Sequence, residues 1–122
     1  MTRVTIDLPF PTSTNAIWRN RQKGSYRSPE YIRWLGLAGQ HWLTQRPRMA
    51  VKRISGAYSL SVILAPPDKR QRDLDNSLKS LNDFLVNSNI VDSDHLCSKL
   101  YVRWGDSQEA PLGCRVTIRE VG

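Results

Sequence analysis

The chain has 122 residues, of which 39% are hydrophobic and 24% are charged. This length and composition fit one folded domain spanning residues 1–122 and exclude a disordered chain. Lys and Arg number 18 against 11 Asp and Glu, which gives a net charge of +7. A basic excess favours a polyanionic partner, most often nucleic acid, although charge that serves only solubility is an equal alternative.

The two cysteines, Cys97 and Cys114, are too few for a disulfide framework and lack the spacing of a zinc site. We expect both to be reduced thiols within strands. The N-terminal residues contain no apolar signal core, and no apolar run approaches the length of a membrane span. These features predict a cytoplasmic protein.

Hydrophobic periodicity predicts a small α/β (α+β) domain with a mixed sheet and two main helices, in the order β-α-β-α-β-β. The expected elements are a strand over 3–8, a helix from Ser28 that Pro47 ends, a strand over 57–64, a helix over about 74–87, and strands over 96–104 and 114–120. The polar, Gly-containing stretch 105–113 is expected to join the last two strands as a hairpin.

Residues 12–27 are polar and basic, and we interpret them as a loop. The basic residues stand around two aromatic ones, Trp18 and Tyr26; they are Arg19, Arg21, Lys23 and Arg27. This mixture suits contact with a nucleic-acid backbone together with base stacking. A solvated loop whose Trp18 packs into the core is an equal alternative.

The segment 68–79 places two carboxylates, Asp73 and Asp75, on a strongly basic chain. The residues that surround them are Lys69, Arg70, Arg72, Asn76 and Lys79. Carboxylates repel phosphates, so a nucleic-acid-binding face normally lacks them. They become useful when a divalent cation bridges carboxylate and phosphate. The pattern therefore suggests a metal-dependent enzyme that cleaves phosphodiesters.

The chemistry depends on where the second helix begins. We expect Asp73 in the extended approach and Asp75 in the first turn, so that both reach one cation. Lys79, one turn after Asp75, could neutralise a scissile phosphate or protonate a leaving oxygen, and Asn76 could orient a carboxylate or bind metal. The alternative is that Asp caps the helix and Asp75 forms an ordinary ion pair with Lys79, which taken alone is the commoner origin of this pattern.

A second acidic segment contains Asp92 and Asp94, just before the strand predicted over 96–104. It can approach the first segment if that strand lies alongside the one ending near Ala65, as in a β-α-β unit. A third carboxylate would then complete an oxygen-rich Mg²⁺ site. The alternative is an Asx turn after Asn89. The adjacent His95 could contact substrate or water.

Arg72-Asp73-Leu74-Asp75-Asn76, followed by Lys79, resembles the core motif of the RusA-type Holliday junction resolvases. Leu8-Pro9-Phe10-Pro11 and Leu64-Ala65-Pro66-Pro67 also match, and the resemblance covers nearly the whole chain. These are small, often prophage-borne endodeoxyribonucleases of bacteria that act in DNA recombination and repair. The resemblance implies a bacterial or phage-encoded homodimer that uses Mg²⁺ or Mn²⁺ to cut four-way DNA junctions by paired hydrolysis.

The resemblance also implies roles for individual residues. Asp73 and Asp75 correspond to catalytic metal-binding carboxylates and Lys79 to a catalytic lysine. A further acidic position of the family falls on Asp94, although Ser93 here replaces the aspartate that precedes it, and Asp92 is held in reserve. The residues expected to contact DNA are Lys69, Arg70, Arg72 and Asn76, with Arg19, Arg21, Lys23 and Arg27 as a second basic surface.

Two other functions remain open. One is a non-catalytic DNA-binding module whose Asp residues only cap a helix. The other is a nuclease that acts on other branched DNA.

Overall fold

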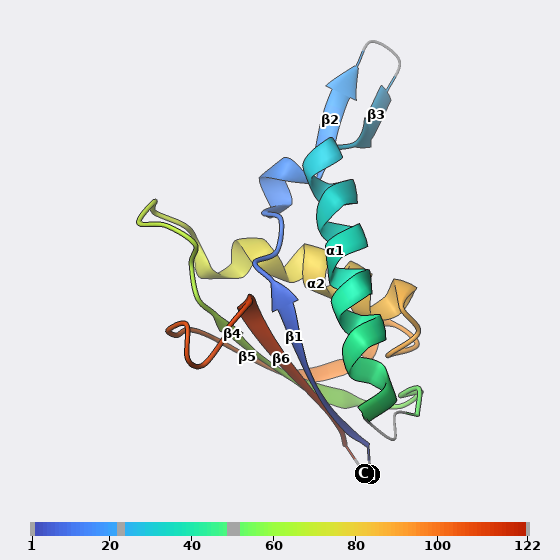
Figure 1. Cartoon of the computed structure of the whole chain (residues 1–122). Helices are drawn as coiled ribbons and strands as arrows, with labels where there is room; N and C mark the ends of the chain where they lie inside the picture. The colour runs from blue at the N-terminus through green and yellow to red at the C-terminus, as the bar shows by residue number, and fades with distance from the viewer. Residues whose placement is uncertain (1, 22–23, 49–51, 122) are drawn as a thin grey trace.

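The computed structural model of the chain describes residues 2–21, 24–48 and 52–121 (Figure 1). Four strands form the main sheet, in the order β1 (Arg3–Pro9), β6 (Gly113–Glu120), β4 (Tyr58–Leu64) and β5 (Cys97–Trp104). β6 runs antiparallel to both of its neighbours, whereas β4 and β5 are parallel. The mixed sheet and two helices confirm the predicted α+β class.

One face of this sheet is buried, because its strands alternate between apolar and polar residues. The buried side chains of the three paired strands are Val4, Ile6, Leu8, Tyr58, Leu60, Val62, Leu64, Cys114, Val116 and Ile118. Helices α1 (Pro29–Gln45) and α2 (Leu78–Asn87) supply the other half of the core. The opposite face is polar: Asp7 of β1, for example, pairs with Arg115 of β6 at 2.8 Å.

Helix α1 begins and ends where the sequence predicts. The Ser28 hydroxyl accepts a hydrogen bond from the Tyr31 backbone N–H at 3.1 Å, and Pro29 occupies the first turn. A short 3₁₀ turn, η2 (Arg46–Arg48), follows the helix. Trp34 and Trp42 are each only 5% exposed, so the aromatic surface of α1 belongs to the core.

Tyr31 and Trp34 connect α1 to α2. The Trp34 ring meets Phe84 edge-on, with ring centroids 5.8 Å apart. The Tyr31 hydroxyl donates a hydrogen bond to Asp83 Oδ2 at 3.1 Å. Burial first, and then the Asp83 charge, raise the pKa of Tyr31 to about 12.

The predicted hairpin between the last two strands is wrong. β5 and β6 are not partners, because β4 lies between them. The connecting residues pass across the end of β4, where Gly105 N–H donates to Leu64 O at 2.8 Å and Ala65 N–H donates to Gly113 O at 2.9 Å. β6 instead lies in the middle of the sheet, where β1 pairs with one of its edges and β4 with the other.

The prediction of a loop over residues 12–27 missed the short elements that this segment contains. After a 3₁₀ turn, η1 (Thr14–Ala16), the chain forms a hairpin of β2 (Trp18–Arg21) and β3 (Gly24–Arg27). Its base is closed by the Ser28 N–H, which donates to Ile17 O at 2.7 Å. Figure 1 shows the hairpin extending beyond the N-terminal end of α1. The predicted DNA contact Lys23 lies outside the described residues.

Neither cysteine forms a disulfide: Cys97 is partly exposed and Cys114 is buried in β6. Burial raises the pKa of the Cys114 thiol far above its ordinary value. Within residues 2–21, 24–48 and 52–121, none of the helices has both the length and the apolar character that crossing a membrane requires.

Gly113 is a position where the backbone does not accept a side chain without strain. Its φ is +117°, and a Cβ there would lie 2.7 Å from the backbone nitrogen of Phe10. We expect Gly113→Ala to lower the free energy of unfolding by about 1–3 kcal/mol, measured by urea denaturation. Gly56→Ala is the matched control, because a Cβ at Gly56 meets nothing within 4 Å. Equal effects of the two substitutions would contradict this assignment.

Stability should also depend on alkaline pH. The pKa of Tyr31 and of Tyr58 is raised from 10.0 to about 12, mainly by burial. The unfolded chain therefore releases these protons first, so this stability is complete below about pH 10 and is lost as pH rises toward 12. In urea titrations across this range, Tyr31→Phe should lose less stability with pH than the unmodified protein. If Tyr31→Phe and the unmodified protein lose stability equally with pH, the Tyr31 hydroxyl is not buried as the structure indicates.

Candidate active site

The basic loop that follows β4 is organised by Asp68. Its Oδ2 lies 3.1 Å from Arg70 Nη2, and its Oδ1 lies 2.8 Å from Arg72 Nη1. Hydrogen bonds from Arg72 and then Arg70 hold the pKa of the Asp68 carboxyl well below its ordinary value. The Arg72 guanidinium in turn lies over the Phe10 ring, 5.3 Å from its centroid. The loop is thereby fixed against the segment that follows β1.

The predicted placement of the first two carboxylates is confirmed. Asp73 has extended backbone angles, φ −81° and ψ 136°, and Asp75 lies in the 3₁₀ turn η3 (Leu74–Ser77) that leads into α2. Asp73 stands at the N-cap position, but its side chain makes no capping hydrogen bond. The interpretation of Asp73 as a helix cap therefore loses its main physical basis.

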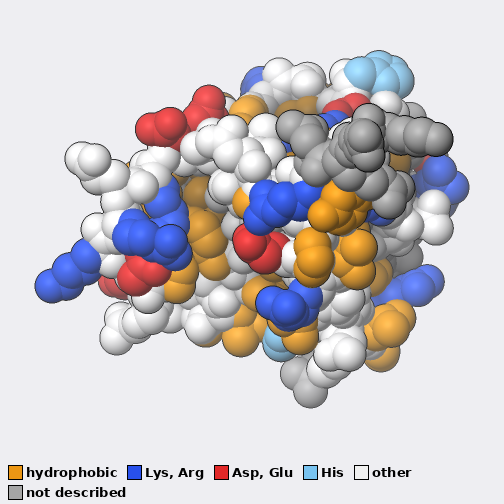
Figure 2. Space-filling view, turned by 90° about the horizontal axis from the view of Figure 1, so that it is seen from above, with side chains coloured by type: hydrophobic (Ala, Val, Ile, Leu, Met, Phe, Trp, Pro, Cys, Tyr) orange, Lys and Arg blue, Asp and Glu red, His pale blue; other side chains and the backbone are white. Residues whose placement is uncertain are grey.

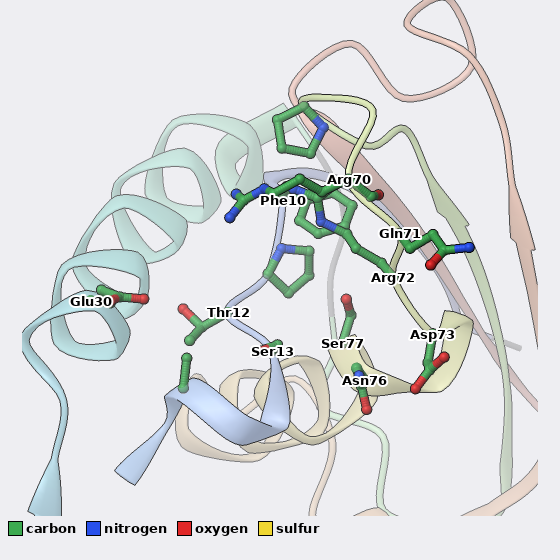
Figure 3. A pocket seen from close by; sticks show the side chains of 13 residues that line it. Phe10, Thr12, Ser13, Glu30, Arg70, Gln71, Arg72, Asp73, Asn76 and Ser77 are labelled. Carbon is green, nitrogen blue, oxygen red and sulfur yellow. Dashed lines mark hydrogen bonds between the residues drawn. The ribbon is translucent and has the colours of Figure 1, made fainter. Parts of the chain in front are cut away.

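A cavity of about 730 Å³ opens between η3, the basic loop and the segment after β1 (Figure 3). Its wall carries charged, amide, hydroxyl and aromatic groups; the lining includes Phe10, Thr12, Ser13, Glu30, Arg70, Arg72, Asp73 and Asn76. The volume lies within the usual range for ligand sites. Four residues predicted from the sequence, Arg70, Arg72, Asp73 and Asn76, thus share one cavity wall.

Phe10 and Glu30 were not singled out by sequence reasoning. The Phe10 ring contacts the Arg72 guanidinium, and Glu30 lines the cavity from the first turn of α1, on the side away from Asp73 (Figure 3). The Leu-Pro-Phe-Pro stretch was a signal for Phe10, since it belongs to the family resemblance. Nothing local in the sequence distinguishes Glu30 from an ordinary acidic residue in the first turn of a helix.

Lys79 is paired with Asp83 and not with Asp75. Its Nζ lies 3.1 Å from Asp83 Oδ1, one helical turn further along α2. The alternative that Asp75 and Lys79 form an ion pair is therefore wrong. Asp83 also accepts the hydrogen bond from the Tyr31 hydroxyl, so Lys79 is held by a carboxylate that α1 fixes in place. The spacing of Asp83 four residues after Lys79 was the available sequence signal.

The second acidic segment precedes β5. The approach predicted for the two acidic segments required β5 to lie alongside β4, and the two strands do pair in parallel. η3 packs beside β5. Asp94 begins a 3₁₀ turn, η4 (Asp94–Leu96). After burial and Cys97, the Asp94 charge is a further cause of the raised pKa of Tyr58. Asp94 therefore lies near the start of β4.

Asp92 and His95 have structural partners. The Asp92 carboxylate pairs with Arg53, and its backbone N–H donates to Ile54 O at 3.0 Å. His95 Nδ1 lies 2.6 Å from the Ser93 hydroxyl, whose oxygen also accepts from the His95 N–H. Of the two aspartates in this segment, Asp92 is thus occupied by an ion pair that ties two loops together.

The acidic side chains fall into two groups. Eight of the 11 accept hydrogen bonds or ion pairs: Asp7, Glu30, Asp68, Asp83, Asp92, Asp106, Glu109 and Glu120. The other three are Asp73, Asp75 and Asp94, whose exposed carboxylates make no hydrogen bond or ion pair with any residue that the structure describes. On a chain of net charge +7, carboxylates that remain unpaired are available to an external cation.

These three are the carboxylates that the sequence assigned to a metal. Among the described residues, no three or more His, Cys, Asp or Glu side chains are grouped closely enough to hold an ion by themselves. Mg²⁺ is commonly bound by one or two carboxylates with water and substrate phosphate, and prefers oxygen donors. Asp73 and Asp75 fit such a donor set, with the Asn76 carbonyl nearby in sequence. The assignment of Asp94 as a third ligand stays a prediction.

Two of the predicted DNA contacts outside this cavity are held by the first turn of α1. Arg19 Nη2 lies 3.1 Å from Glu30 Oε1, and the Arg27 guanidinium lies 5.7 Å from the centroid of the Tyr31 ring. Lys69 is exposed on the loop after β4. Figure 2, viewed from the hairpin end, shows Lys and Arg side chains interspersed with acidic and apolar ones. This face therefore combines positive charge with apolar contact area.

The chain matches known proteins over most of its length. The family model described as Endodeoxyribonuclease RusA matches residues 9–119, a range that includes the cavity and both acidic segments. The chain is also 33% identical over 97 residues to the crossover junction endodeoxyribonuclease rusA of Enterobacteria phage HK97, which covers 71% of this chain and 70% of that protein. A family match of this extent shows that this protein belongs to the RusA endodeoxyribonuclease family.

Proposed function

We propose that this protein is a structure-selective endodeoxyribonuclease that resolves four-way DNA junctions in recombination and repair. It would act in the cytoplasm of a bacterium, as a bacterial or phage-encoded enzyme. Membership of the RusA family and the name of the phage relative support this class of activity. The observation that carries the proposal is the set of three exposed carboxylates, Asp73, Asp75 and Asp94, that pair with no residue in the described parts of the chain.

A divalent cation is the proposed cofactor, Mg²⁺ or Mn²⁺, held by Asp73 and Asp75 with Asp94 as the candidate third ligand. When bound, such an ion lowers the pKa of a bound water and stabilises charge on a phosphate undergoing displacement. The carboxylates supply oxygen donors, and they need no rearrangement of existing ion pairs because they have none with the described residues. Asp92 would have to release Arg53 before it could serve.

The neighbouring cations would position the DNA. Lys79, held by Asp83, would offset the charge of the phosphate being cleaved. Lys69, Arg70 and Arg72 would bind the flanking backbone, with the Arg pair already oriented by Asp68. Water attack at the phosphorus would break the bond to the 3′-oxygen and leave a 5′-phosphate and a 3′-hydroxyl.

A homodimer would place two such sites on opposed strands of a two-fold junction. The edge strand β5 supports this assembly. Leu100 and Trp104 pair in register with core residues of β4, yet they are 48% and 39% exposed. An unpaired edge with uncovered apolar side chains is suited to a second copy of the chain.

The nuclease proposal is tested with a labelled synthetic four-way junction. With Mg²⁺ the protein should nick opposed strands symmetrically, and with chelator it should only bind. Asp75→Asn should reduce the cleavage rate more than about 100-fold, because a metal ligand contributes at least as much as its supporting partners. Its junction affinity should be kept or increased, because a charge that repels phosphate is removed.

Asp92→Asn is the matched control for the acidic cluster. It removes the carboxylate that pairs with Arg53, so it should affect stability more than cleavage, whereas Asp94→Asn should affect cleavage. Cleavage without a metal ion, or full activity of Asp75→Asn, would contradict the proposed metal-dependent mechanism. Binding without nicks under all conditions would favour a DNA-binding module, and preference for flaps would favour another branched substrate.

The dimer is tested by light scattering after gel filtration. The expected mass is twice the 14.0 kDa of the chain. Leu100→Lys should yield the single-chain mass, because a charge would be buried in the interface. Leu112→Lys is the control, since Leu112 is similarly exposed, at 41%, but lies outside β5. A single-chain mass for the unmodified protein would contradict the dimer.

A further inference from the structure

We infer that Trp18, on the β2–β3 hairpin, stacks on a nucleobase left uncovered at the branch point of the DNA. This inference rests on the proposed function, since it needs a branched substrate. It assigns to the hairpin the recognition of unstacked bases, while the carboxylates and their neighbouring cations bind the strand that is cut.

The exposure of Trp18 is the first observation. The side chain is 52% exposed, whereas Trp34 and Trp42 are each 5% exposed in the core. The Trp18 indole makes no hydrogen bond or ring contact with any residue that the structure describes. The alternative that Trp18 packs into the core is therefore wrong. A large planar apolar group held in water is poorly placed for stability and well placed for stacking on a ligand.

The base of the hairpin is firmly attached, which is the second observation. Ile17 is buried at 1% exposure, immediately before Trp18. The Ser28 backbone N–H donates to Ile17 O at 2.7 Å, and the Ser28 hydroxyl donates to Ala16 O. Arg19 is paired with Glu30 at 3.1 Å. Trp18 thus projects from a fixed point, so that little conformational freedom is lost when its ring stacks.

The third observation is the position of this fixed point beside the candidate active site. Ala16 and Glu30 belong to the wall of the cavity that Asp73 also lines (Figure 3). Trp18 follows Ala16 by two residues and begins the hairpin that rises past α1 (Figure 1). The hairpin that carries Trp18 therefore begins beside the cavity that would receive a DNA phosphate at Asp73.

The chemistry distinguishes branched from linear DNA. In a continuous duplex every base is covered by its neighbours, and an aromatic side chain must first unstack them to gain a contact. At a branch point some base faces can be uncovered at lower cost. Stacking is tolerant of base identity, and positive charge supplies affinity for any DNA. Trp18 should therefore contribute to discrimination between structures more than to general affinity.

The experiment compares binding of a four-way junction with binding of a linear duplex of the same sequence, in chelator so that no cleavage occurs. Trp18→Leu keeps an apolar side chain but removes the planar ring. It should weaken junction binding about tenfold or more and duplex binding less than about twofold. Trp18→Phe should retain most of the preference. Leu43→Ala is the control, because Leu43 is 64% exposed near the C-terminal end of α1, away from the hairpin.

The outcomes separate this inference from the proposed function. Equal losses for junction and duplex, or no loss for Trp18→Leu, would overturn the role of Trp18 while leaving junction preference intact. If the unmodified protein shows no preference for the junction, the proposed function fails and the inference fails with it. The thermal unfolding midpoint of each variant, compared with that of the unmodified protein, checks that the substitution has not disrupted the fold.

Discussion

The parallel pairing of β4 with β5 is the constraint on which the rest of the molecule depends. Two parallel strands cannot be joined by a tight turn, so the chain must leave the end of β4 and return to the start of β5 through a crossover. That crossover contains the basic loop, η3, α2 and the turn before β5. Asp73, Asp75 and Asp94 all lie in it, and the strands on either side fix both of its ends.

Ion pairs decide which charged groups remain available. Asp68 holds Arg70 and Arg72, Asp83 holds Lys79, and Asp92 holds Arg53. Such surface pairs contribute little to stability individually, but each fixes where a charged group points. Asp73, Asp75 and Asp94 lie outside these pairs and repel phosphate, and a bound cation would offset that repulsion. This charge pattern supports the proposed binding of a metal ion together with a polyanion.

Two exposed surfaces besides the carboxylates carry apolar side chains that suit a binding partner. Leu100 and Trp104 of the edge strand β5 are exposed although their partners in β4 belong to the core. The hairpin lies apart from the core and displays Trp18 next to a cavity wall. We assign the first surface to a second copy of the chain and the second to bases of DNA, because an extended strand edge matches another strand and a single planar ring matches a base.

The sequence by itself determined the elements and the motif. Alternation identified the strands, the Ser28-Pro29 cap identified the start of α1, and local spacing placed Asp73 in extended chain and Asp75 in a turn, since all these depend on neighbouring residues. Only the tertiary structure decided that β6 lies between β1 and β4, that β2 pairs with β3, and that Lys79 pairs with Asp83. Strand order depends on contacts between residues far apart in the chain. A charged side chain can reach several partners, and the packing of the helices decides which of them comes within about 3–4 Å. A local sequence pattern therefore cannot predict the pair.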